Sequence, residues 1–379
     1  MSSAAARLLS GLFTASAPTK TAASNTVITK SGKFQTMVSK FKTSSESEDF
    51  RSRYDIYLNT VLRLAKFRRF SMIEEILQHQ KNFKDITDEP YTSRLIALYG
   101  KAGMFENARK LYDEMPDLNC PRTVYSFNAL LSACIDSGKF DKIEGILKDL
   151  PDELRLTLDV VSYNIIIKGY YKMRALDSAA AVLDRMIKEG VNPNLITFNT
   201  LLNGFYSNDR FADGERIWGK MEEMNVVPNV RSYNAKLYGL AFEKRMKEAV
   251  ELIEEMKSKE IEPDLYSYRG LIRAFVEDEN LEEAKWWYCD IMKKGCVLDK
   301  ITLEKLLGFV CEKGDFCSAY EICVENLKKC RFDEALLQVV ADGLIKDSKV
   351  EDAEKLMQLS KRKIKVISLS SQYDIDNYE

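Results

Sequence analysis

The sequence predicts an all-α solenoid in which about nine pairs of helices stack one after another. The chain matches itself at an interval of 35 residues, so that 160–194 aligns with 195–229. Within each block, apolar residues recur with i, i+4, i+7 spacing, as in Tyr163, Ile167 and Tyr170. This spacing is typical of one face of an amphipathic helix, and it appears in both halves of a block. Each block is therefore expected to form two helices.

A proline followed by Asn or Asp separates the best-matched blocks, at Pro193, Pro228 and Pro263. Proline cannot continue a helix, whereas Asn and Asp favour the start of the next one. A helix pair of this size cannot bury its own apolar face, so stacking of neighbours is expected to form a superhelix with a long concave surface. The expected repeats are 54–88, 89–123, 124–159, 160–194, 195–229, 230–264, 265–299, 300–333 and 334–366.

The two ends of the chain are predicted to lie outside these repeats. Residues 1–53 contain no acidic residue before Glu46 and are rich in Ser, Thr and Ala. Such a basic, acid-poor composition is typical of an organellar transit peptide followed by a disordered linker, and Arg7 beside Leu8 favours mitochondria over plastids. A disordered tail without a targeting role is the alternative. Residues 367–379 are predicted to form a solvated acidic tail.

The charge distribution limits how the chain can bind nucleic acid. Residues 1–53 carry eight Lys or Arg and three acidic residues, a balance of +5, so the rest of the chain carries -7 of the total of -2. Binding through phosphates alone requires cationic neutralisation, so RNA contacts should be local and centred on bases. No apolar run approaches the roughly 18 residues needed to span a bilayer, so no membrane partner is expected.

The chain is predicted not to be an enzyme and to need no cofactor or metal. His79 is the only histidine, and none of the eight cysteines forms a CxxC pair, whereas a zinc site needs closely spaced Cys and His. No Ser/His/Asp arrangement can be built, and the zinc deaminase signature is absent. Most of the cysteines fall within apolar helical patterns, so they are expected to be small buried residues in a reducing compartment.

Three sequence strings carry a family resemblance: "VVSYNIIIKGYYK", "NPNLITFNTLLNGF" and "EPDLYSY". They resemble the pentatricopeptide repeat (PPR) family of organellar RNA-binding proteins, in particular its P class. The resemblance spans residues 54 to about 366 and is strongest over 124–299. It implies a right-handed superhelical solenoid of helix-turn-helix repeats. Tetratricopeptide repeats share the geometry, but they have a period of 34 and a Trp/Gly/Tyr pattern that is missing here.

The resemblance also implies which residues read RNA. In this family one base is read per repeat, by the fifth residue of the first helix together with the last residue of the repeat. Asn with Asp resembles a uridine reader and Asn with Asn favours cytidine, so a U-C-C-U-like tract is expected. The alternative is that an Asn near a helix start only satisfies free backbone N–H groups. The four pairs are Asn128 with Asp159, Asn164 with Asn194, Asn199 with Asn229, and Asn234 with Asp264.

Two further positions resemble family contacts. The second residue of a repeat resembles the one that sandwiches a base, and it is Tyr125, Val161, Ile196 or Arg231 in the four central repeats. The thirteenth resembles a contact to the RNA backbone and is Lys101 or Lys172 in two repeats, but Asp136, Glu277 or Glu312 in others. Affinity for phosphate is therefore expected to be modest. The fifth residues of the flanking repeats depart from the pattern: Leu58, Ser93, Arg269, Glu304 and Gln338.

Four degenerate sites cannot select one transcript from many, because specificity is weighed against the number of competing sites. Protein partners are therefore expected to fix the position of the chain. It is similar to short PPR proteins of plant mitochondria, some of which belong to the small subunit of the mitochondrial ribosome. The predicted function is thus a matrix protein that contacts ribosomal RNA and small-subunit proteins, but not DNA. The alternatives are a free factor for pyrimidine-rich single-stranded transcripts, a scaffold that binds only proteins, and a location in the plastid stroma.

Overall fold

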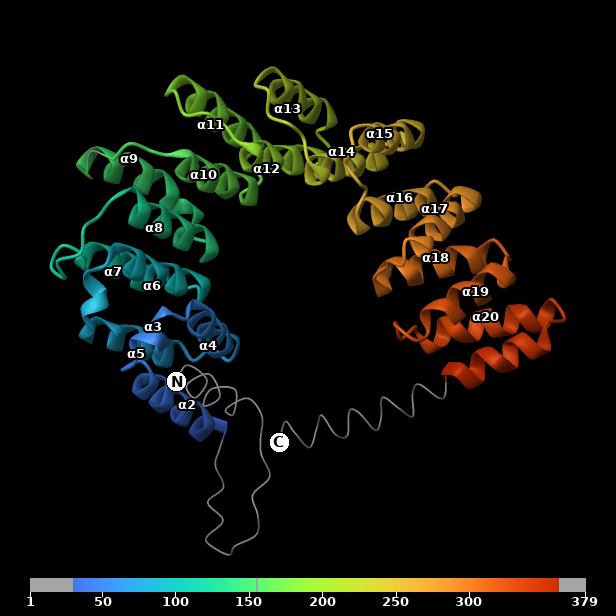
Figure 1. Cartoon of the computed structure of the whole chain (residues 1–379), viewed down its shortest axis with the longest axis horizontal. Helices are drawn as coiled ribbons and strands as arrows, with labels where there is room; N and C mark the ends of the chain where they lie inside the picture. Colours follow the sequence, from blue (N-terminus) through green and yellow to red (C-terminus); the bar gives the residue numbers. More distant parts are fainter. Residues whose placement is uncertain (1–29, 155, 361–379) are drawn as a thin grey trace, which may run out of the picture. The chain divides into compact units, whose positions relative to one another are not determined.

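The computed structural model describes residues 30–154 and 156–360, and every regular element in these ranges is helical. The prediction of an all-α solenoid is confirmed (Figure 1). Residues 1–29 of the predicted transit peptide and linker, and the predicted acidic tail over 367–379, lie outside the described residues. The chain forms two compact units that meet in sequence between Pro193 and Asn194.

Over residues 30–154 and 156–193, unit 1 contains two leading helices followed by four helix pairs. The leading helices are α2 (Lys30–Ser44) and α3 (Glu48–Ser52). Short 3-10 turns, η1 (Gln80–Asn82), η2 (Lys84–Thr87) and η3 (Phe140–Lys142), connect or extend some of the helices that follow. The pairs are α4 (Tyr54–Lys66) with α5 (Phe70–His79), α6 (Glu89–Lys101) with α7 (Phe105–Glu114), α8 (Val124–Asp136) with α9 (Ile143–Leu154), and α10 (Val160–Lys172) with α11 (Leu176–Lys188).

Unit 2 continues the same pattern, and the last helix described in it covers residues 350–360. Its first helices pack side by side, whereas each second helix packs on its own partner and on the next first helix. In Figure 1, α14, α16 and α18 accordingly form the inner layer of this unit. Its helices are α12 (Leu195–Tyr206), α13 (Phe211–Glu223), α14 (Val230–Phe242), α15 (Met246–Ser258), α16 (Leu265–Glu277), α17 (Leu281–Lys293), α18 (Lys300–Glu312), α19 (Phe316–Asn326) and α20 (Glu334–Lys346).

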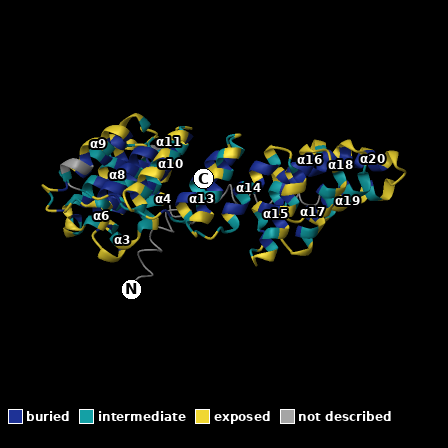
Figure 2. Cartoon of the chain, turned by 90° about the horizontal axis from the view of Figure 1, so that it is seen from above, coloured by how far each residue is buried: buried dark blue, intermediate teal, exposed yellow. Residues whose placement is uncertain are grey.

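The apolar periodicity of the sequence becomes the core between the two layers. Tyr163 and Ile167 of α10 and Phe198 and Leu202 of α12 are each at most 1% exposed. In Figure 2 the buried residues follow one side of the helices and the exposed residues the other. Burial of this periodic face supplies the main driving force for stacking, because the hydrophobic effect scales with the apolar area removed from water.

The turn inside each hairpin has the same conformation throughout the described residues. The fifteenth residue of every repeat has a positive φ, between 54° and 78°. The N–H of the next residue then donates to a carbonyl five residues earlier, as in Arg245 to Leu240 at 2.9 Å, which closes the first helix. Six of the nine residues are not glycine, although the left-handed conformation costs them about 1 to 2 kcal/mol each. They are Arg68, Gly103, Gly138, Arg174, Asp209, Lys244, Glu279, Gly314 and Ser348.

The folded part begins earlier than the predicted boundary near Arg53. Helix α2 packs against α5, and Val38 and Phe41 of α2 are at most 1% exposed. The Phe41 ring contacts Phe50 and Tyr57 edge-on, with centroids 5.1 and 4.8 Å away. The basic and polar composition of this segment predicted a disordered linker, yet its apolar residues have helical spacing. The end of a repeat stack needs such a cover, because the terminal repeat has no neighbour on one side.

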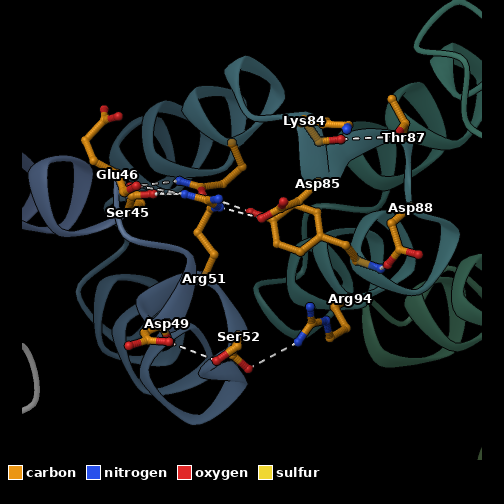
Figure 3. Close-up of polar contacts among 12 residues, drawn as sticks. Ser45, Glu46, Asp49, Arg51, Ser52, Lys84, Asp85, Thr87, Asp88 and Arg94 are labelled. Carbon is orange, nitrogen blue, oxygen red and sulfur yellow. Dashed lines mark hydrogen bonds and ion pairs between the residues drawn. The ribbon is translucent and has the colours of Figure 1, made fainter. Parts of the chain in front are cut away.

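Arg51 of α3 joins this cover to the first repeat (Figure 3). Its guanidinium forms an ion pair with Asp85 and donates to the carbonyl oxygens of Ser45 and Glu46 at 2.9 and 3.0 Å. It also lies over the Phe83 ring, 4.5 Å from the centroid. The hydrogen bond with Asp85 raises the pKa of Arg51 above its ordinary value despite the opposing effect of burial. These contacts make residues 45–52 part of the folded chain.

Candidate RNA-binding surface

The last residue of each repeat caps the first helix of the next one. At the start of every first helix from α6 to α20, a side-chain oxygen of the capping residue accepts a hydrogen bond from a backbone N–H of the first turn. The proposed role of Asn and Asp in starting the helices is thus confirmed, with Thr123 as the one hydroxyl variant. The caps are Asp88, Thr123, Asp159, Asn194, Asn229, Asp264, Asp299 and Asp333.

The fifth residue of a repeat reaches this cap. Asn234 Nδ2 donates to Asp264 Oδ1 at 2.9 Å, and Asn199 Nδ2 donates to Asn229 Oδ1 at 3.2 Å. The structure therefore brings together the residues that the sequence paired, although 30 positions separate them.

The Asn128–Asp159 pair has the same contact, at 3.1 Å. The remaining predicted pair, Asn164 and Asn194, is divided between the two units. Three predicted pairs are thus direct hydrogen-bond partners.

These fifth-position amides bond to side chains rather than to backbone N–H groups. While Nδ2 donates to the cap, Oδ1 accepts from a serine: Asn199 Oδ1 accepts from Ser232 Oγ at 2.6 Å, and Asn234 Oδ1 accepts from Ser267 Oγ at 2.6 Å. Each half-buried amide is thus oriented by both the cap and the first turn of the next repeat. Such support fixes the side-chain position before a ligand arrives, which lowers the entropic cost of binding.

The cap keeps one polar atom uncommitted. All side-chain hydrogen bonds of Asp264 described in the structure use Oδ1, including those from the N–H groups of Tyr266 and Ser267 at 3.0 and 3.1 Å. Asn229 likewise accepts only through Oδ1. Backbone N–H groups require an oxygen acceptor, so the remaining atom is the acceptor Oδ2 in Asp264 and the donor Nδ2 in Asn229. The two types of repeat therefore offer opposite hydrogen-bonding groups at one position.

The Asn128 pair is more enclosed than the others. Asn128 is 8% exposed, and its Oδ1 is buried without a hydrogen-bond partner. Burial alone raises the pKa of Asp159, but hydrogen bonds from Ser162 and Asn128 outweigh it and lower the pKa below its ordinary value. Asp159 is therefore ionised at neutral pH, while the Asn128 amide is less accessible to a base than Asn199 or Asn234.

The predicted base-sandwiching residues are exposed at the starts of their helices. Tyr125 and Val161 are about half exposed, and Ile196 is 63% exposed, although the last two are aliphatic. Arg231 is also exposed. Tyr266 and Ile301 occupy the same position and are 68% and 67% exposed. They were not among the predicted residues, because the prediction covered only the four repeats with Asn at position five. The second position thus presents a large exposed side chain at the start of the first helix in several repeats.

The predicted backbone-binding lysines are partly neutralised. Lys101 Nζ lies 2.7 Å from Asp136 Oδ2, and Lys172 Nζ lies 3.7 Å from Asp136 Oδ1. All three residues occupy position thirteen, in consecutive repeats of unit 1. One carboxylate thus competes with phosphate for both ammonium groups, which agrees with the expectation of modest phosphate affinity.

The flanking repeats use their fifth residues differently. Arg269 forms an ion pair with the cap Asp299 at 2.6 Å, and Glu304 accepts from the backbone N–H of Asp333 at 2.8 Å. The side chains still reach the next cap, but a charged group replaces the neutral amide. Recognition of a base edge is therefore expected in repeats with Asn at this position.

Over 30–154 and 156–360, no group of three or more His, Cys, Asp or Glu residues has an arrangement that could hold a metal ion. None of the helices described is long and apolar enough to cross a membrane.

The cysteines divide into two groups. Burial raises the pKa of Cys134 and Cys311 to about 11 and that of Cys323 to about 12, so these thiols are protonated at neutral pH. Cys120 is buried as well, whereas Cys317 and Cys330 are partly exposed and Cys289 and Cys296 are exposed, so full burial holds for half of the eight cysteines rather than for most of them.

Comparison with known families identifies the repeat. Two related models, described as "PPR repeat family" and "PPR repeat", match the chain and together cover more than half of it. The first matches residues 92–149, 158–207, 193–241 and 228–277, and the second matches 266–296.

Relatives and solved structures agree with this match. The chain is 46% identical over 152 residues to the small ribosomal subunit protein mS79 (rPPR3b) of Arabidopsis thaliana, and 46% identical over 155 residues to mS78 (rPPR3a). These matches cover 40% and 41% of this chain, and the chain spans only about two fifths of the length of either relative, 39% in both cases. The crystal structure of PPR10 from maize superposes with a TM-score of 0.53 and 17% identity, over 88% of this chain and 57% of that one, which shows the shared fold.

Proposed function

Because the chain belongs to the pentatricopeptide repeat family, we propose that it is a non-catalytic RNA-binding protein of plant mitochondria and a component of the small ribosomal subunit there. The observation that carries RNA binding is the oriented pair of the fifth-position amide and the helix cap, in which the caps Asn229 and Asp264 each keep one side-chain atom uncommitted. In Asp264 this atom accepts and in Asn229 it donates, which suits the N3–H of uracil and the N3 of cytosine respectively.

The ribosomal part of the proposal is supported by the relatives. Both Arabidopsis proteins with 46% identity are named as small ribosomal subunit proteins. The neutralised lysines also favour a protein held in place by neighbours, because free binding to RNA needs more phosphate contacts. The matrix location follows from this role.

Sedimentation of a mitochondrial lysate tests the ribosomal assignment. The full-length tagged protein should sediment with the small subunit through a high-salt gradient, because a component held by proteins as well as RNA resists screening of surface charges. A protein that remains at the top of the gradient at low salt as well would refute ribosome membership.

A second candidate function is a free factor for pyrimidine-rich single strands, favoured by the uncommitted cap atoms. The test is the affinity of the purified chain for an oligonucleotide containing UCCU. Replacing both Asn199 and Asn234 with Ala should weaken binding roughly tenfold or more, since each change removes a reader and takes from a serine hydroxyl the closer of its two side-chain acceptors.

The matched control is Gln338→Ala. This exposed fifth-position amide bonds to Asp342 on its own helix at 2.8 Å, not to a cap, so its loss should leave RNA affinity unchanged. Equal RNA affinity of the double variant and the wild type would refute the assignment of Asn199 and Asn234 as base readers. Ribosomal sedimentation without RNA affinity would instead favour a protein-binding scaffold.

A further inference from the structure

An aromatic pocket lies between the first helices α14 and α16 of unit 2. It is a cavity of about 290 Å³ whose walls include Tyr238 and Phe242 of α14 and Tyr266, Arg269 and Arg273 of α16. The three aromatic side chains are 52%, 56% and 68% exposed, in that order. Protein pockets for small ligands measure about 300 to 1,000 Å³, so this one suits a single planar group.

The aromatic character is specific to this place in the array. Tyr238 and Phe242 occupy positions nine and thirteen of their repeat, which face the same side of a helix. The same two positions in other repeats hold no aromatic residue: Lys168 and Lys172, Asn203 and Ser207, Arg273 and Glu277, and Gly308 and Glu312. The pocket is thus not a product of the general repeat pattern.

The charge of the pocket is positive because of Arg273. Arg269 lies over the Tyr266 ring, 5.4 Å from its centroid, but its charge is compensated by Asp299. Glu277 at the edge of the pocket forms an ion pair with Lys305. Arg273 is exposed and forms no hydrogen bond or ion pair with the residues that the structure describes. It is therefore available to an anionic ligand.

The pocket begins directly at a proposed reader. The backbone N–H of Tyr266 donates to Asp264 Oδ1, the oxygen that also accepts from Asn234. An RNA strand whose base contacts the free Oδ2 of Asp264 therefore has the pocket next to it. This continuity favours a nucleotide over an acidic peptide as the occupant.

We propose that the aromatic pocket holds one unpaired nucleotide adjacent to the base at Asn234 and Asp264, with its base stacked on an aromatic ring and its phosphate on Arg273. This inference rests on the proposed function in RNA binding. Stacking is sequence-tolerant, since every base has a π-face, so the pocket anchors the strand without reading it. The pocket thereby supplies affinity for RNA that Lys101 and Lys172 of unit 1, which form ion pairs with Asp136, do not supply.

Gly270 provides a way to close the pocket without disturbing the fold. It also lines the cavity, and a Cβ built on it has no atom within 4 Å. Leu at this position has room in the folded chain and a higher helix propensity than Gly, so Gly270→Leu should fill the pocket while maintaining or raising the thermal midpoint. The matched control is Gly308→Leu, since Gly308 is also half-buried, helical and open, but lies outside the pocket.

The experiment uses full-length chain and UCCU oligonucleotides with 2-aminopurine placed either directly before or directly after the motif. Stacking in the pocket should quench the fluorescence of one of the two probes on binding. Gly270→Leu, Tyr238→Ala and Arg273→Ala should each weaken binding. Loss of stacking should lower the affinity about 5- to 150-fold, and the first two variants should abolish the quenching. Gly308→Leu should bind as the wild type does.

The outcomes separate the two proposals. If the wild type binds neither oligonucleotide, RNA binding itself is wrong and the pocket assignment fails with it. If the wild type binds and Asn199→Ala weakens it, but neither probe is quenched and the pocket variants bind equally well, the readers stand and the pocket assignment is refuted. If an acidic peptide competes for the pocket while RNA does not, the occupant is a protein.

Discussion

Replacing Asp264 with Asn is expected to shift the preference at one base from uracil to cytosine while preserving the fold. Asp264 Oδ1 accepts from two backbone N–H groups, from Ser267 Oγ and from Asn234. Asn229 makes the equivalent set of contacts one repeat earlier. An Asn at 264 can therefore keep every contact through Oδ1, and only the uncommitted atom changes from an acceptor to a donor.

The expected magnitudes for stability and recognition differ. Asn and Asp are nearly equivalent helix caps, so the change in stability should be limited to the lost charge at the helix N-terminus, about 0.3 to 1 kcal/mol. Discrimination between bases should change by about 1 to 3 kcal/mol, or roughly 5- to 150-fold in relative affinity. Asp264→Ala should instead lose the cap, at about 0.5 to 2 kcal/mol, and weaken binding to both bases.

Fluorescence anisotropy with UCCU and UCCC oligonucleotides, together with chemical denaturation, measures both quantities. An inverted order of affinity for the Asn variant, with a nearly unchanged denaturation midpoint, is expected. If the variant loses affinity equally for the two sequences, or keeps the wild-type preference, the uncommitted cap atom does not read the base.

Three further changes test other parts of the structure. Phe41→Ala should lower the free energy of unfolding by about 3 to 5 kcal/mol, because it empties a fully buried site under α2; denaturation indistinguishable from wild type would contradict the docking of this helix. Asp136→Asn should free two lysines and make RNA affinity higher and more salt-dependent, as measured by the slope of log affinity against log salt; an unchanged slope would show that these lysines do not meet phosphate. Because the pKa of Asp159 is lowered in the folded chain, its ionised form stabilises the fold above about pH 4, and this stabilisation is lost as the pH falls through the lowered pKa. The Asp159→Asn variant should therefore lose less stability than the wild type in that pH range. Identical acid denaturation profiles of the two proteins would oppose this account.

The helical part of the fold was predictable because it depends on local patterns. The i, i+4, i+7 spacing defines the buried face of each helix, and the Pro-Asn and Pro-Asp pairs locate helix starts. The first helices begin at the first residue of each expected repeat, from Tyr54 to Glu334. The hairpin turns were harder to predict from the sequence, because residues such as Arg174 and Lys244 adopt a positive φ although they are not glycine. Packing of the two helices imposes that conformation against the local preference.

The site was predictable in part. The pairing of Asn199 with Asn229 and of Asn234 with Asp264 came from the resemblance, and the structure adds which atoms bond and which remain uncommitted. Burial of Asn128 depends on its surroundings and has no sequence signature.

By itself, the sequence determined the period, the buried face of each helix and the residues that cap them, because these features depend on neighbours within about one turn or one repeat. The structure decided how residues from different repeats meet. It placed Asp136 between two lysines, docked α2 on α5 and grouped Tyr238, Phe242 and Tyr266 around one cavity. Such contacts join side chains across packed helices, and their distances follow from the packing rather than from any local pattern.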